Sequence, residues 1–262
     1  MNACPWKPDF WNPRLEKVVA SERAPTSLQT TINRMKKIIL ALVIAMISWT
    51  SAQADNALSA PVPDGNWENL FAADLTNAVF SPGIWSWKDG ELSPRDKDEA
   101  IWTKQEYENF VLDLEFKLEP GANSGVFVYN TDLNNWTPNT VEIQILDDPD
   151  PKWANIPPNW KCGGIFGHSV PLKSPTKKAG EWNHITIWCR GPAIKVQING
   201  EVVTDLNMQD WKSGTKNPDG SDIPNFEPRP LAQMATKGRI GLQGAHGGIP
   251  THFRNLRIKS IE

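Results

Sequence analysis

The chain has 262 residues, with 27 Lys or Arg and 30 Asp or Glu, so its formal net charge is −3. A slightly acidic chain lacks the basic surface that binds nucleic acid or an anionic membrane, and neither partner is expected. The sequence contains no internal repeat, no low-complexity segment and no long amphipathic helix with recognisable caps.

The first 54 residues are not expected to belong to the folded domain. Two lysines precede an unbroken apolar run at residues 38–47, and the Ser-Ala-Gln-Ala segment that follows ends in a small-x-small cleavage site. This order predicts a signal peptide over residues 35–54, with an apolar part too short to span a bilayer stably. We therefore expect translation to begin at Met35 and residues 1–34 to be a non-native upstream extension. The alternative is a cytosolic tail followed by a single anchor helix.

Cleavage after Ala54 predicts an exported protein, either periplasmic or secreted, with no stable membrane span. Removing the seven basic and three acidic residues of the leader leaves 20 basic and 27 acidic side chains, a net charge of −7. Residues 55–66 are small and Pro-rich and are expected to be a flexible linker. Residues 67–262 are enough for one domain with a sizeable core. Within that domain Cys162 and Cys189 could form a disulfide, although Cys189 continues a strand register and is typical of a buried core residue.

From Trp67 onward, short segments with strand alternation are separated by clusters of Gly, Pro, Asn and Asp. The dipeptide Asn199-Gly200 follows an alternating run and is a strong signal for a hairpin turn. Many short strands at hairpin spacing predict an antiparallel β-sandwich or jelly roll. The clearest strands are expected at residues 110–118, 125–130, 140–146, 181–190, 193–199, 239–243 and 252–261.

The strand expected at residues 140–146 has one apolar face, and Glu142 and Gln144 point to the other. This pattern is typical of a sheet that is covered on one side and open on the other. Strict alternation aims Asp147 inward, but a bulge at Leu146 or Asp147 would return its carboxylate to the face of Glu142. The alternative is a solvated strand that ends in an Asp-Asp-Pro turn.

Two long segments, residues 148–180 and 205–238, are rich in Pro, Gly and Asn and carry Trp153, Trp160 and Trp211. Loops of this length in a compact sandwich are usually functional. Tryptophan faces on such loops suit sugar rings, and the alternative is that they pack back onto the sandwich edges.

Common catalytic signatures are missing: the chain has no Gly-x-Ser-x-Gly, no His-Glu-x-x-His, no phosphate-binding Gly loop and no Cys-x-x-Cys. His168 and His246 are each flanked by glycines that would let a ligand approach the backbone closely. A lone loop histidine is more often a hydrogen-bonded surface residue. His184 and His252 are expected in or beside strands.

An ordered set of motifs closely resembles the 3-keto-disaccharide hydrolase domain family, also described as 3-keto-glucoside-1,2-lyase/hydratase. The likeness runs from about Trp67 to Ile261 and implies a concanavalin-like jelly roll. The motifs that carry it are Asn-Ser-Gly-Val-Phe at 123–127, Glu-Ile-Gln-Ile-Leu-Asp at 142–147, Gly-Gly-Ile-Phe-Gly at 163–167, Gly-Glu-Trp-Asn at 180–183, Ile-Asn-Gly at 198–200, Gly-Arg-Ile-Gly-Leu-Gln at 238–243 and Phe-Arg-Asn-Leu-Arg-Ile at 253–258.

The resemblance implies an enzyme that cleaves 3-keto-glycosides, with an oligosaccharide or 3-keto-glycoside as its partner. A ketone at C3 acidifies the C2–H, a base removes that proton, the C1 substituent leaves, and water adds to the enone. This chemistry needs a base, a stabiliser for the enolate oxygen and a donor to the leaving oxygen. The expected catalytic residues are Glu142, Asp147 and His246, and the expected substrate-binding residues are Asn123, Gln144, Trp160, His168, Gln243 and Arg254.

Proton transfer is assigned to His246 with Glu142, and Asp147 is expected to orient them or to bind a metal. The spacing does not demand a cofactor, but the Glu142, Asp147 and His246 side chains together offer a workable oxygen and nitrogen set for a divalent ion that would polarise the ketone.

The chain departs from the family pattern at three places. Tyr129 stands where the family tends to have Arg, and Phe166 stands where Tyr is usual. The usual Gln-Asp-His-Gly reads Gln-Gly-Ala-His-Gly at residues 243–247, one residue longer and without the acid. Losing a carboxylate beside the histidine alters its pKa and orientation, and the three departures together leave two alternatives open, altered specificity or loss of catalysis.

Two other functions fit the same scaffold. One is a non-catalytic carbohydrate-binding module that uses Trp stacking together with Gln and Asn side chains. The other is a retaining glucanase, which needs a Glu nucleophile and a Glu acid about 5–5.5 Å apart. In such enzymes a Glu-x-Asp-x-x-Glu strand supplies both acids, whereas here Gln144 and Asp147 occupy the later positions.

Overall fold

The computed structural model of the chain describes residues 65–226 and 229–262. The predicted extension, signal peptide and nearly all of the predicted linker lie outside these residues. Within the described part, regular structure consists of β-strands and short 3₁₀ turns, and the paired strands are antiparallel. The predicted antiparallel jelly-roll sandwich is confirmed. The described residues include no helix with the length and apolarity needed to cross a membrane.

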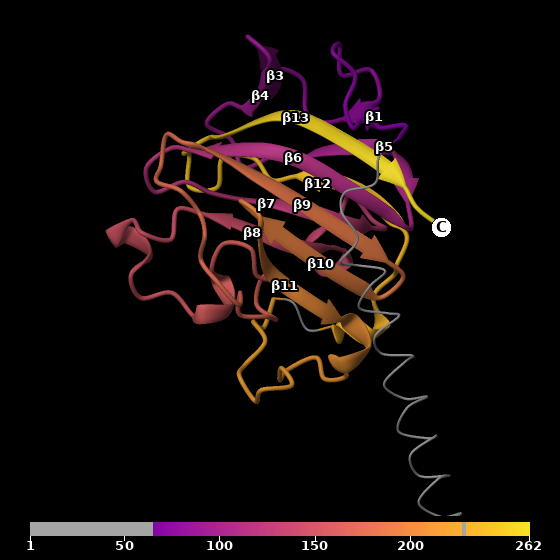
Figure 1. Ribbon diagram of the computed structural model, residues 1–262, viewed down its shortest axis with the longest axis vertical. Helices are drawn as coiled ribbons and strands as arrows, with labels where there is room; N and C mark the ends of the chain where they lie inside the picture. The colour runs from indigo at the N-terminus through magenta and orange to yellow at the C-terminus, as the bar shows by residue number, and fades with distance from the viewer. Residues whose placement is uncertain (1–64, 227–228) are drawn as a thin grey trace, which may run out of the picture. The chain divides into compact units, whose positions relative to one another are not determined.

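The larger sheet has eight strands in the order β11-β10-β9-β6-β13-β4-β3, with β1 paired to β13 (Figure 1). Its central strands come from the regions that alternate most clearly in the sequence. Its members are β1 (Glu68–Asn69), β3 (Trp85–Lys88), β4 (Glu91–Pro94), β6 (Phe110–Leu118), β9 (Trp182–Arg190), β10 (Ala193–Ile198), β11 (Glu201–Asn207) and β13 (Thr251–Ser260).

The smaller sheet has five strands in the order β2-β5-β12-β7-β8. Its members are β2 (Ala78–Val79), β5 (Ile101–Tyr107), β7 (Asn123–Asn130), β8 (Val141–Leu146) and β12 (Gly238–Leu242). Short 3₁₀ turns lie in the long loops at Thr137–Asn139, Pro151–Trp153, Pro158–Trp160, Met208–Asp210 and Leu231–Gln233.

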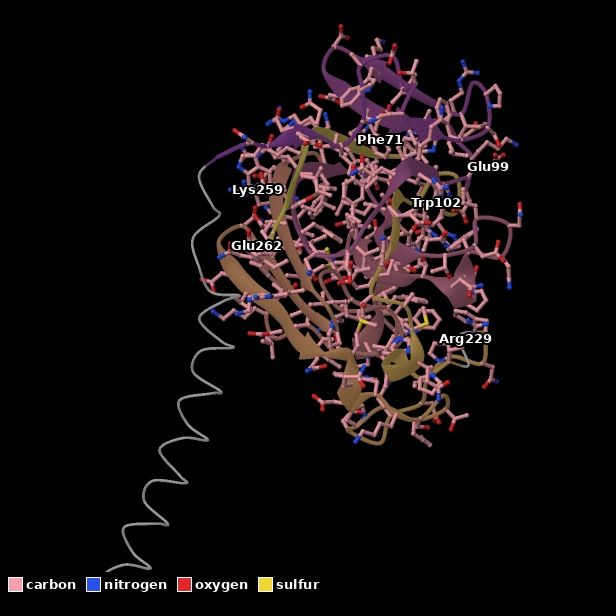
Figure 2. All side chains as sticks on the ribbon, turned by 90° about the vertical axis from the view of Figure 1, so that its right-hand side faces the viewer. Phe71, Glu99, Trp102, Arg229, Lys259 and Glu262 are labelled. Carbon is pink, nitrogen blue, oxygen red and sulfur yellow. The ribbon has the colours of Figure 1, made fainter. Side chains whose placement is uncertain are left out.

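The hydrophobic core fills the space between the sheets. In Figure 2, Lys259 of β13 lies on one side of the sandwich and Trp102 of β5 on the other, with side chains packed between them. Strand β8 shows how the sequence specifies the two faces: Val141, Ile143 and Ile145 are buried in the core, as their alternation predicts. The opposite face of β8 is thereby turned outward.

The hairpin predicted at Asn199-Gly200 joins β10 to β11. Both turn residues have positive φ, 49° and 86°, which is the conformation that a tight two-residue hairpin requires and that Asn and Gly tolerate. Strand β11 extends to Asn207, so the predicted loop at 205–238 begins three residues later than expected.

Cys162 and Cys189 are both buried free thiols, so the disulfide considered from the sequence is not formed. Burial raises the pKa of each thiol to about 12. Cys189 lies inside β9, where its register places it in the core as expected. Buried, protonated thiols of this kind behave as small apolar side chains.

Candidate active site

A cleft of about 400 Å³ lies on the outward face of the five-stranded sheet, over β8 and β7. Its volume falls in the range of small-molecule sites. Alternation along β8 places Glu142, Gln144 and Leu146 in its lining, on the face opposite the core residues. The remaining lining residues are Asp98, Asn123, Trp136, Thr137, Trp153, Ile156, Trp160, Phe166, Phe226, Gln243 and His246.

Glu142 lies across the neighbouring strand β7, over the backbone of Gly125. A Cβ atom at position 125 would collide with the carboxyl group of Glu142 and lie 2.9 Å from its Cγ and Cδ atoms. Glycine at this position therefore makes room for the carboxylate on the floor of the cleft. The segment that contains Phe166 pairs with β8 at the edge of this sheet, where the Phe166 N–H donates to the Glu142 carbonyl at 3.0 Å.

Three amide side chains line the cleft together with Glu142. They are Asn123 of β7, Gln144 of β8 and Gln243, which directly follows β12. The Gln144 Nε2 group donates to Asn123 Oδ1 at a long 3.4 Å, and the Gln243 backbone N–H donates to the Gly125 carbonyl at 2.9 Å. Gln144 is 2% exposed and Gln243 is 8% exposed, yet neither side-chain carbonyl oxygen has a hydrogen-bond partner among the residues that the structure describes. An unpartnered buried acceptor costs free energy, so both oxygens suit donors such as sugar hydroxyls.

His246 lines the cleft and is paired with a carboxylate that could not be found from the sequence. Its Nδ1 atom lies 2.6 Å from Asp98 Oδ2, and both side chains are partly exposed, 50% and 39%. The backbone of His246 bridges to Asn123, which places the imidazole beside β7. Glu142 and His246 therefore share one cleft, as the predicted mechanism requires.

The loop that carries Asp98 is fixed by backbone contacts. The Ala245 N–H donates to the Lys97 carbonyl at 2.7 Å, and Trp85 Nε1 donates to the Glu99 carbonyl at 2.7 Å. A Cβ atom at Gly244 would collide with the backbone of Lys97 and Glu99. The glycine at 244 therefore permits the close packing that brings the Asp98 loop to His246.

The hydrogen bond to Asp98 raises the pKa of His246 above its ordinary value, against the opposing effects of partial burial and of the positive charge of Lys152. The imidazolium form is therefore populated to higher pH than in a free histidine. This favours a histidine that donates a proton near neutral pH.

Trp160, Phe166 and Phe226 form an aromatic wall in the lining of the cleft. The ring centroids of Trp160 and Phe166 are 4.9 Å apart, and those of Phe166 and Phe226 are 6.1 Å apart. Phe226 is 52% exposed, which leaves an aromatic face open to a ligand. Such faces bind the apolar side of a sugar ring.

Three residues predicted for the site lie elsewhere. Asp147 does not line the cleft: no bulge interrupts the β7–β8 register, and its carboxylate accepts the Gly121 N–H at 2.9 Å as part of the turn after β8. His168 is buried outside the cleft, where its Nδ1 donates to the Phe166 carbonyl at 2.8 Å and burial lowers its pKa. Arg254 belongs to the eight-stranded sheet and pairs with Glu115.

The remaining predicted residues, Asn123, Gln144, Trp160 and Gln243, all line the cleft with Glu142 and His246. Besides the segment at residues 243–247, the other two departures from the family pattern lie at Tyr129 and Phe166. Tyr129 is fully buried in the core and its hydroxyl donates to the Gly191 carbonyl, so that substitution does not alter the cleft. Phe166 does line the cleft, where its ring carries no hydroxyl.

The predicted metal-binding trio is not assembled. Asp147 points to Gly121 while Glu142 and His246 line the cleft, and residues 65–226 and 229–262 contain no group of three or more His, Cys, Asp or Glu side chains arranged to hold a metal ion. The residues present therefore do not fit that proposed centre.

A jelly roll whose outer face carries an acid, a histidine, three amides and an aromatic wall in one sugar-sized cleft is a carbohydrate-active protein. Residues 60–259 match the 3-keto-alpha-glucoside-1,2-lyase-like domain, and the chain belongs to that family. No curated protein sequence matches this chain.

Solved structures similar to this chain come from Parabacteroides distasonis and are named as putative glycosyl hydrolases. One is 54% identical, with a TM-score of 0.73, over 75% of this chain and all of its own. A second is 21% identical, with a TM-score of 0.63, over 75% of this chain and 95% of its own, and shares the fold.

Proposed function

We propose that this chain is an exported enzyme that cleaves 3-keto-glycosides by elimination and hydration. The observation that carries the proposal is the shared cleft of Glu142 and His246, which also holds two amide oxygens without a partner in the described part of the chain. Membership of the lyase-like family supports the same reaction class. The polar floor suits a hydroxyl-rich ring, and the aromatic wall suits its apolar face.

In the proposed first step, Glu142 takes the C2 proton of the keto sugar. The C2–H electron pair forms an enolate with the C3 ketone, and the electrons then form the C1=C2 bond as the C1–O bond breaks. His246 gives a proton to the leaving oxygen, which departs as an alcohol. Amide N–H groups of Asn123 or Gln243, which line the cleft, would bind the oxygen that gains charge.

In the second step, water adds to the enone. Its hydroxyl bonds to C1 and a proton returns to C2, which regenerates the ketone and yields the free keto sugar. The acid and base exchange roles, because the groups left protonated and deprotonated by elimination are those that hydration needs. The net reaction is hydrolysis of the glycosidic bond.

The deciding experiment compares the pure protein on a 3-keto-disaccharide and on the same disaccharide before oxidation. Release of sugar from the keto form alone is the expected result. Cleavage of the unoxidised disaccharide would point to a glucanase instead. The Glu142→Gln and His246→Ala variants should each remain folded and lose turnover by about 10²–10⁴-fold. Full activity in both would remove these residues from the mechanism.

Binding of the keto sugar without turnover would support the alternative, a non-catalytic carbohydrate-binding module. The aromatic wall, with Phe226 half exposed, is the observation that favours that reading. Export by a cleaved signal peptide is tested separately. N-terminal sequencing of the protein recovered outside the cytoplasm should show a chain that begins near residue 55. A chain that begins near residue 2 would refute the predicted start site and cleavage.

A further inference from the structure

We propose that Asp98 is the positioning residue of His246, holding the imidazole so that Nε2 delivers the proton to the leaving oxygen. This inference rests on the proposed function for its catalytic part. The carboxylate that the family pattern places beside the histidine is missing from residues 244–245, and Asp98 supplies one from a loop nearly 150 residues earlier in the chain.

The hydrogen bond to Asp98 determines which ring nitrogen of His246 is left for a substrate. A carboxylate accepts hydrogen bonds, so at 2.6 Å the Nδ1–H of His246 donates to Asp98 Oδ2. The neutral imidazole therefore carries its proton on Nδ1, and Nε2 is left for the substrate. The charged groups that bear on this ring are Asp98 and, more weakly and with opposite sign, Lys152.

The loop position does not depend on the Asp98 side chain. The backbone bond from Ala245 to Lys97 and the indole bond from Trp85 to Glu99 hold the loop on either side of it. The Asp98→Asn variant should therefore keep the fold and the loop while weakening control of the imidazole. Asp96, an exposed acid two residues earlier, provides the matched control Asp96→Asn.

The test uses two 3-keto-glycosides that differ in the group that leaves: one releases a second sugar, a poor leaving group, and the other releases nitrophenolate, which departs without protonation. Asp98→Asn should lower kcat about 10–100-fold on the disaccharide and less than about threefold on the nitrophenyl compound, as expected when proton donation is lost. Asp96→Asn should change neither. Equal losses on both substrates would overturn the inference.

A double-variant cycle asks whether Asp98 acts through His246. In the His246→Ala background, Asp98→Asn should cause no further loss, because a positioning residue has nothing left to position. A loss of the same factor in both backgrounds would show that Asp98 acts independently and would overturn the assignment.

An NMR measurement separates this inference from the proposed function. The ¹⁵N spectrum of the ring at a pH above its titration should show His246 as the Nδ1–H tautomer in the wild type and a mixture in Asp98→Asn. A wild-type Nε2–H tautomer would overturn the inference whatever the activity. Absence of turnover in a wild type with the Nδ1–H tautomer would refute the proposed function and leave the positioning role supported.

Discussion

Replacing Gly125 with alanine should disable the site without unfolding the domain. The added Cβ would lie 2.9 Å from the Cγ and Cδ atoms of Glu142. Ordinary carbon contacts are about 3.5–4.0 Å, so the Glu142 side chain must move by about 0.6–1 Å. A misplacement of about 1 Å at a reacting group costs about 10²-fold in rate, which is the loss expected in kcat for Gly125→Ala.

Stability should respond differently from activity. The group that must move is the Glu142 side chain, which faces the cleft rather than the core. Alanine also restricts the unfolded chain more than glycine does, which stabilises the folded strand by about 0.5–1 kcal/mol. The two effects oppose each other, so the free energy of unfolding should change by less than about 1 kcal/mol. Urea unfolding of the variant and the wild type measures this, beside turnover of the 3-keto-disaccharide.

A double variant makes the reasoning refutable. If Gly125 matters because it gives Glu142 its place, Gly125→Ala should add no loss to the Glu142→Gln variant. Full turnover in Gly125→Ala would show that the observed position of the carboxylate over β7 is not needed. A large loss of stability would show instead that the strand itself is damaged.

Three further changes test other parts of the structure. Asp147→Ala should lower the free energy of unfolding by about 1–3 kcal/mol, because the Gly121 N–H loses its acceptor, and should leave kcat unchanged; a loss of kcat at equal stability would return Asp147 to the site. The hydrogen bond to Asp113 raises the pKa of His184, so this pair stabilises the fold fully below about pH 6.5 and less as pH rises through the raised value. The His184→Gln variant should therefore show a flatter pH dependence of stability above pH 6.5, and an unchanged dependence would contradict the assignment. Phe226→Ala should raise KM several-fold with little change in kcat or thermal midpoint, since this ring is half exposed; an unchanged KM would remove the ring from the substrate path.

The sandwich could be predicted because its strands alternate strongly. Residues 110–118 were expected as a strand and form β6 with the same bounds, and the alternation at 140–146 correctly separates core from cleft. Strand β5 was missed because its residues do not alternate between buried and exposed. Three consecutive polar residues, Lys104, Gln105 and Glu106, are all exposed. Its burial comes from pairing with β12, which local sequence does not show.

Placement in the cleft was predicted correctly for residues whose position depends on the register of β8, and wrongly for Asp147, whose position depends on a turn. Glu142 and Gln144 follow from alternation alone. Asp147 was placed by supposing a bulge, but the β7–β8 register runs without interruption and the following turn uses the carboxylate to bind the Gly121 N–H. Arg254 could have bound a ligand by its chemistry, but it belongs to β13. That strand lies in the eight-stranded sheet, whereas the cleft lies on the five-stranded sheet.

Asp98 could not be found from sequence for a more general reason. The segment around it contains Asp96, Asp98 and Glu99, three acids of equal standing in the sequence, and nothing local distinguishes the one that meets His246. Gly244 determines which acid meets His246, because without a side chain its backbone can pack closely against the backbone of Lys97 and Glu99. The Ala245 N–H can then donate to the Lys97 carbonyl. Gly244 thus admits the distant carboxylate of Asp98 to the histidine. A larger residue at 244 should push the loop away, and the pKa of His246 should then fall toward its ordinary value.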